Sequence, residues 1–81
     1  MGEIPLVWNG TLVGWLKDVE TETMTGAPGK VEGDFVCAEG PVAVEFRSRL
    51  EGHETLEVRR ADSDAVALCY GRRGGRAKLA W

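Results

Sequence analysis

The feature that most constrains the fold of this chain is the Asn9-Gly10 dipeptide, which separates two apolar runs, 4–8 and 11–16. A type I′ turn needs positive φ at both central positions, which Asn and Gly tolerate. The dipeptide therefore predicts a β-hairpin with a two-residue loop. Side chains alternate between the two faces of a strand, so one face of this hairpin carries three cross-strand pairs that can form part of the hydrophobic core. These pairs are Trp8 with Thr11, Leu6 with Val13, and Ile4 with Trp15.

Two residues inside the hairpin shape its expected geometry. Pro5 lacks an N–H group, so the first strand is expected at a sheet edge, or with Pro5 at its start. Gly14 lies inside the second strand, expected over 11–19, and a glycine there indicates a bulge or a close crossing of another segment.

Length and composition indicate a small soluble domain. The chain has 81 residues, which fits one domain over 1–81. Its residues are 43% apolar and 28% charged, which argues against a disordered tail or a membrane protein. Eleven glycines in so short a chain indicate many turns, and hence mostly β structure.

Strand patterns recur along the rest of the chain. Apolar and polar residues alternate in 30–37, 55–60 and 76–81, as in strands with one solvated face. The residues expected to point inward are Val31, Phe35, Cys37, Leu56, Val58, Ala77, Leu79 and Trp81. The stretch 65–70 is apolar throughout, which indicates a central strand covered on both faces. The Gly and Pro content of 21–30 predicts a turn or loop.

The stretch 41–51 is the one ambiguous element. Val42 or Ala43, with Phe46 and Leu50, forms a stripe at helical spacing, and Pro41 suits the first position of a helix. Glu45 and Arg49 form a favourable i,i+4 pair, and Gly52 follows where a C-terminal cap belongs. These features predict a helix over about 41–51, while the β-branched valines leave a strand as the alternative.

The fold class is therefore α+β. We expect mainly an antiparallel sheet, or a small partly open barrel, of five to six strands with one short helix at about 41–51. An all-β version follows if 41–50 is a strand. Large side chains must fill a small core. Those expected to meet in it are Trp8, Trp15, Phe35, Phe46, Leu68 and Trp81.

The sequence indicates the cytoplasm and no membrane. The N-terminus is acidic where a signal peptide is basic, and no apolar run approaches the ~20 residues that span a bilayer. In a reducing compartment Cys37 and Cys69 are free thiols, with a disulfide as the less favoured alternative. Two cysteines and the single His53 are too few for a tetrahedral zinc site, so no cofactor or metal is expected.

Several acidic residues are candidates for weak calcium binding. They are Asp18, Glu20 and Glu22, which would line one face of an extended strand, and Asp62 and Asp64 in a turn. None has the ligand spacing of a calcium loop. Solvated acids, which can also protect an edge strand from pairing with another chain, are the simpler interpretation.

The most distinctive surface feature is the Arg/Gly-rich loop 71–76. It brings Arg72, Arg73 and Arg76 together, with Lys78 close behind. Arginine forks suit phosphate or carboxylate, and glycines let a backbone approach a ligand. The loop has neither the P-loop nor the dinucleotide-binding pattern. The structural interpretation is a solvated hairpin loop. The functional interpretation is a contact with an anion, RNA or an acidic partner.

Three functional classes follow. The leading hypothesis is a non-catalytic protein-interaction or accessory module, including a homodimer formed through free sheet edges. The alternative is a nucleic-acid or anion-binding module that uses the loop residues, with Arg59 and Arg60 as further contacts. An enzyme is least favoured, because it needs a cysteine or acid brought to His53 and no local motif does this.

Overall fold

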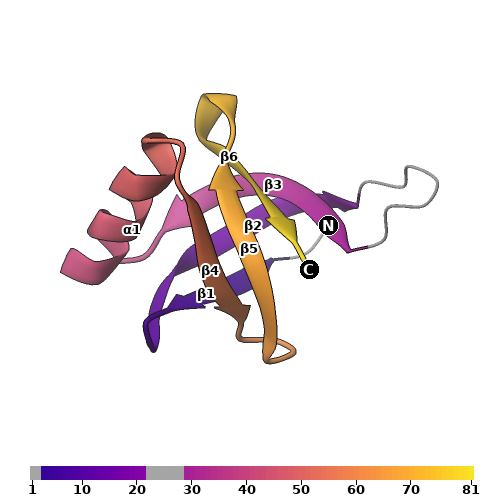
Figure 1. Ribbon diagram of the computed structural model, residues 1–81, viewed down its shortest axis with the longest axis horizontal. Coiled ribbons are helices and arrows are strands. Elements are labelled where there is room, and N and C mark those ends of the chain that lie inside the picture. The colour runs from indigo at the N-terminus through magenta and orange to yellow at the C-terminus, as the bar shows by residue number, and fades with distance from the viewer. Residues whose placement is uncertain (1–2, 22–28) are drawn as a thin grey trace.

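The computed structural model describes residues 3–21 and 29–81, and in it six antiparallel strands form a closed barrel (Figure 1). The strands are β1 (Ile4–Trp8), β2 (Thr11–Thr21), β3 (Lys30–Cys37), β4 (Thr55–Arg60), β5 (Ala65–Gly71) and β6 (Arg76–Ala80). One α-helix, α1 (Pro41–Glu51), joins β3 to β4, and a 3-10 turn, η1 (Arg73–Gly75), joins β5 to β6. The prediction of an α+β fold, with an antiparallel sheet or small barrel of five to six strands and one short helix, is confirmed, and the barrel is closed rather than partly open. The expected loop at 21–30 falls mainly on 22–28, outside the described residues.

The barrel consists of two three-stranded meanders. β1-β2-β3 and β4-β5-β6 pair internally, and the barrel closes where β1 meets β4 and β3 meets β6. The strand order around the barrel is β1-β2-β3-β6-β5-β4. Since each strand has a neighbour on both sides, the free sheet edges that we expected to drive homodimerisation are largely removed by closure.

The helix occupies the predicted residues, and the all-β alternative is wrong. Ala43, Phe46 and Leu50 are its buried stripe, and Arg49 Nε lies 3.3 Å from Glu45 Oε2. Gly52 donates its N–H to the Ser48 carbonyl at 3.0 Å, while His53 takes the left-handed conformation, with φ of 64°, that ends the helix.

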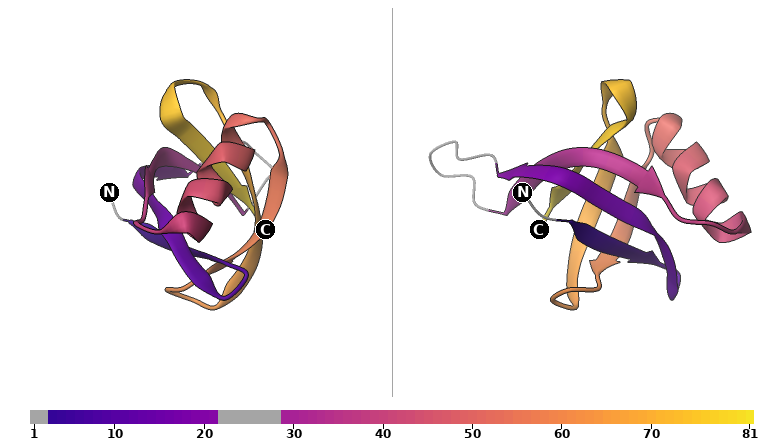
Figure 2. Two further views of the ribbon diagram at one scale, coloured as in Figure 1. Left: turned by 90° about the vertical axis from the view of Figure 1, so that its left-hand side faces the viewer. Right: turned by 180° about the vertical axis from the view of Figure 1, so that it is seen from behind.

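The helix closes one end of the barrel, as the end-on view shows (Figure 2, left). Phe46 is fully buried there, and its ring lies 5.5 Å from the Trp8 ring and 5.7 Å from the Phe35 ring. Tilted rings at these separations attract one another in addition to the area they bury. The expected core positions of Trp8, Phe35 and Phe46 are thus correct.

The hairpin turn is as predicted, but the strand register changes after the second residue pair from the turn. Asn9 and Gly10 have φ of 53° and 76°, and Trp8 pairs with Thr11. A bulge at the predicted place then pairs Leu6 with Gly14 and Ile4 with Leu16, so the expected Leu6–Val13 and Ile4–Trp15 pairs are wrong. The extra residue reverses the inward face of β2, and Leu16 is buried where Trp15 was expected.

Glycine at position 14 is required by a close approach of β3. A Cβ atom there would collide with the Val36 carbonyl and with the Phe35 ring. The edge position suggested by Pro5 is not found, because β1 lies between β2 and β4. Instead Pro5 is next to the strand start and outside the short β1–β4 pairing, where its carbonyl accepts the Ala61 N–H at 3.0 Å.

Two expected core residues are on the surface. Leu68 is 47% exposed and Trp81 is 50% exposed. On β5 the small residues Ala67 and Cys69 point into the barrel, where the larger Leu56 and Leu79 flank Cys69 on the neighbouring strands β4 and β6. The expected inward positions of Leu56, Val58, Ala77 and Leu79 are confirmed.

Phe46→Ala tests the dependence of the barrel on its helical cap. We expect this substitution to lower the free energy of unfolding by about 3–5 kcal/mol, because it leaves a cavity between two aromatic rings. Val44→Ala on the exposed side of the same helix, where Val44 is 56% exposed, should change it by less than about 0.5 kcal/mol. Urea unfolding followed by tryptophan fluorescence measures both, and equal effects would contradict this role of Phe46.

Candidate binding site

The loop 71–76 is held against the C-terminal end of α1. A Cβ atom at Gly71 would lie 2.5 Å from the Leu50 carbonyl oxygen, so only glycine allows β5 to end this close to the helix. The Arg72 N–H donates to the Arg76 carbonyl at 2.7 Å, and Gly74 and Gly75 turn the chain with φ of 73° and 76°. The glycines of the loop therefore fix where its arginines lie.

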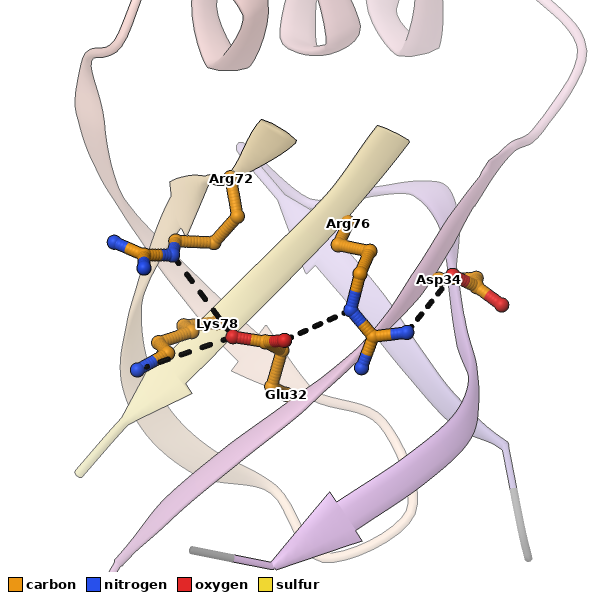
Figure 3. Close-up of polar contacts among 5 residues, drawn as sticks. All are labelled: Glu32, Asp34, Arg72, Arg76 and Lys78. Atoms are coloured by element: carbon orange, nitrogen blue, oxygen red, sulfur yellow. Dashed lines mark hydrogen bonds and ion pairs between the residues drawn. The ribbon is translucent and has the colours of Figure 1, made fainter. Parts of the chain in front are cut away.

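Glu32 of β3 is the centre of the polar contacts around this loop (Figure 3). Arg76 Nε donates to Glu32 Oε2 at 2.8 Å, and Arg76 Nη1 donates to Asp34 Oδ1 at 3.3 Å. Glu32 Oε1 lies farther from its other two cations, 3.9 Å from Arg72 Nε and 3.8 Å from Lys78 Nζ. Arg76 is thus firmly held, whereas the ion pair of Arg72 is long.

The β3–β6 register produces this arrangement. Glu32 pairs with Lys78 and Asp34 with Arg76, so opposite charges face each other across the two strands. The hydrogen bond with Glu32, followed by the charges of Glu32 and Asp34, raises the pKa of Arg76 above its ordinary value. Arg76 therefore stays charged and orders the base of the loop.

The structure brings together most of the cations expected from the sequence, and adds one. Arg72, Arg76 and Lys78 surround Glu32, and Arg73 is exposed at the tip with no ion pair among the described residues. Arg47 reaches the same region from α1. Sequence reasoning missed Arg47, Glu32 and Asp34. A local sequence pattern shows neither where α1 packs relative to the loop nor that β3 pairs with β6.

Two adjoining openings lie beside the loop, one between it and α1 and the other between it and β3. One, of about 120 Å³, is lined by Phe35, Arg47, Leu50, Glu51, Gly71, Arg72, Gly75 and Arg76. The other, of about 400 Å³, is lined by Glu32, His53, Gly71, Arg72, Arg73 and Arg76. We call the two together the cationic cleft. It places four guanidinium groups against the carboxylates of Glu32 and Glu51, in a chain whose net charge is −3.

Arg59 and Arg60 lie at the other end of the β4–β5 hairpin from the cationic cleft. Arg59 pairs with Asp64 at 3.4 Å. Arg60 makes two hydrogen bonds with Asp62, at 3.2 and 3.0 Å, and stacks 4.8 Å from the centre of the Trp81 ring. These contacts from Arg60 lower the pKa of Asp62. The expected contribution of Arg59 and Arg60 to the same site is therefore wrong.

The structure does not bring His53, Cys37 and Cys69 together into one site. His53 is exposed at the cleft, whereas Cys69 is enclosed in the barrel, and burial raises its pKa to about 12. Cys37 is partly buried and donates to the Ala38 carbonyl at 3.2 Å; neither cysteine forms a disulfide.

The acids weighed as metal ligands form no cluster within residues 3–21 and 29–81 that could hold a metal ion. Asp18 and Glu20 lie on β2 beyond Leu16, where the described pairing with β1 ends. Charged side chains on such a stretch fit the protection of an open edge. Glu22 lies outside the described residues, while Asp62 and Asp64 form ion pairs with arginines.

Comparison with known proteins gives this chain no relatives: no protein-family model, no curated protein and no solved structure matches it. In the described part of the chain no helix has both the length and the apolar character needed to cross a membrane.

Glu32→Gln tests how far the ion pairs stabilise the barrel. It keeps the shape of the side chain but removes the charge shared by Arg72, Arg76 and Lys78. We expect the free energy of unfolding to fall by about 1 kcal/mol at low salt, and by less in 1 M salt, where these partly exposed charges are screened. Glu39→Gln, at an exposed carboxylate before α1, is the matched control and should have little effect. Urea unfolding that shows equal losses for both would refute the assignment.

Thiol labelling tests the placement of the cysteines. In the native protein at pH 8 we expect Cys37 to react with iodoacetamide and Cys69 to stay unmodified until urea unfolds the barrel, because the thiolate is the reactive form. Burial raises the folded pKa of Cys69 from 9.0 to about 12, so its resistance should persist as the pH rises to 10. Mass spectrometry of digested samples identifies the labelled residue, and early labelling of Cys69 would contradict its burial.

Proposed function

We propose that this chain is a non-catalytic protein-interaction module that binds an acidic segment of a partner protein in the cationic cleft. The observation that carries the proposal is the convergence of guanidinium groups from two separate elements, α1 and the loop 71–76, on one concave surface. Concave sites with a few convergent polar groups are the usual form of binding sites.

The ion pairs of the individual arginines favour a ligand-binding role of the cleft over a purely structural one. Arg76 is fully engaged by Glu32 and Asp34, but Arg72 is only loosely paired, at 3.9 Å. Arg47 and Arg73 are exposed and have no ion pair among residues 3–21 and 29–81. Three guanidinium forks are therefore available at the cleft, and a fork pairs well with a carboxylate through two parallel hydrogen bonds.

An acidic protein segment fits this cleft better than a nucleic acid does. Single-stranded nucleic acids bind on exposed aromatic side chains, whereas Phe35, which lines the cleft, packs against the buried Phe46. The net charge of −3 also disfavours a long phosphate backbone. Nucleic-acid binding remains the second candidate, because the same arginines would serve it.

The proposal that the chain is non-catalytic rests on where its two cysteine thiols lie. The raised pKa of Cys69 keeps its thiol protonated inside the barrel, while the thiol of Cys37 is only partly buried. Neither lines the cleft beside His53. Two free thiols also suit a reducing compartment, and we propose the cytoplasm as the site of action.

Arg73→Ala tests the proposed binding. The probe is a fluorescein-labelled peptide of eight alternating Glu and Gly residues, titrated with protein in 20 mM salt and followed by fluorescence anisotropy. We expect saturable binding by the native protein and a Kd about threefold to tenfold higher for Arg73→Ala, which loses one charge-assisted contact. Arg59→Ala removes another exposed guanidinium, at the other end of the β4–β5 hairpin, and should leave the Kd within a factor of about two.

The same titrations with labelled oligo-dT distinguish the two candidate functions. Binding to the acidic peptide should exceed binding to oligo-dT at every salt concentration. Tighter binding of oligo-dT, with a steep loss of affinity as salt rises, would replace the proposed function with nucleic-acid binding. Absence of saturable peptide binding, or equal Kd values for the native protein and Arg73→Ala, would overturn it.

A further inference from the structure

The outer face of β5 is unlike that of the neighbouring strands. On β3, β4 and β6 the outward positions carry charges, among them Glu32, Glu57 and Lys78. On β5 the outward positions are Val66, Leu68 and Tyr70, and Val66 and Leu68 are each 47% exposed. The sequence of β5 is that of a strand covered on both faces. Within residues 3–21 and 29–81 only its inner face is covered.

Strand pairing places these residues in an ordered patch. Across β4 and β5, Glu57 pairs with Leu68 and Arg59 pairs with Val66, so two charged and two apolar side chains occupy the corners of a square. Ala80 of β6 lies beside Leu68, and Val7 of β1 lies beside Arg59. We call this surface the β5 outer face. Its residues are Val7, Glu57, Arg59, Val66, Leu68 and Ala80.

We propose that the β5 outer face binds a second copy of this chain. A two-fold axis lying in the interface, perpendicular to the strands, would run the two β5 strands antiparallel. It would set Leu68 of each copy over Val66 of the other, and Glu57 of each copy over Arg59 of the other. A patch that pairs with itself in this way meets the requirement of a two-fold interface, in which the same surface is used by both subunits.

Charge supports a second copy over a partner of one sign. Glu57 and Arg59 stand two residues apart on β4, so the patch has no net charge and complements only a surface with the same two charges in reverse order. The existing pair of Arg59 with Asp64 is highly exposed and 3.4 Å long, so it opposes a new partner weakly. Six residues are fewer than the about 20–30 that each partner contributes to a standard interface, so we expect a weak dimer with micromolar affinity.

A charge-swap series tests the proposal by sedimentation velocity at 5–500 µM protein, read as the fold-change in the dimer dissociation constant. We expect Glu57→Arg and Arg59→Glu, each alone, to raise it about tenfold, because like charges then face each other. The double variant Glu57→Arg with Arg59→Glu should return it to within about threefold of the native value, since the reversed pair again complements itself. Both positions are on the surface, so we expect the barrel to stay intact in these variants.

Apolar variants provide the second arm of the test. Leu68→Glu should raise the dissociation constant more than about tenfold, while Val44→Glu, an equally exposed apolar residue on α1, should leave it unchanged. A strict monomer at 500 µM, or a dimer insensitive to Leu68→Glu, would overturn the proposal and leave the face to a different partner. Failure of the double swap to restore association would overturn the two-fold arrangement. Peptide binding at the cationic cleft is measured separately and does not depend on these results.

Discussion

The narrow interior of a six-stranded barrel is the constraint on which the rest of this structure depends. Inward positions near its middle accept Ala67, Cys69 and Ala77, with leucines and valines around them. The largest buried side chain, Phe46, enters from one end on α1 and packs between Trp8 and Phe35. The helix is therefore both the connection between the two meanders and the closure of the core. Its C-terminal end, held close to Gly71, becomes one wall of the cationic cleft.

Local signals in the sequence were sufficient for the elements of the fold. The Asn9-Gly10 turn, the helix from Pro41 to Glu51 and the strands after it are all in place, because turn chemistry and periodicity act over few residues. The inward phase of strands was harder to predict. Because of one bulged residue near Gly14, Leu16 is buried in the core instead of the expected Trp15. On β5 both faces are apolar, so alternation could not show that Ala67 and Cys69, rather than Leu68, point inward.

The candidate site was predictable only in part for a related reason. Arg72, Arg73, Arg76 and Lys78 are close in sequence, and their common location followed from the loop. Their partners Glu32 and Asp34 are more than forty residues away, at 44 and 42 positions from Arg76. That contact depends on the pairing of the last strand of one meander with the last strand of the other, which no local pattern specifies. Arg47 was likewise hidden until the position of α1 was known.

The two proposed surfaces constrain each other through β5, which leads to the cationic cleft at Gly71 and carries the outer face along its length. In the proposed dimer the two β5 strands run antiparallel, so the clefts lie at opposite ends of the assembly. Seven residues of strand span about 23 Å, so the clefts are separated by at least about that distance. A peptide of fewer than about seven residues cannot reach both, because an extended chain spans about 3.3–3.6 Å per residue, and each copy then binds one peptide independently. Only a partner that carries two acidic segments, far enough apart to span the dimer, would gain affinity from dimerisation through a raised effective concentration.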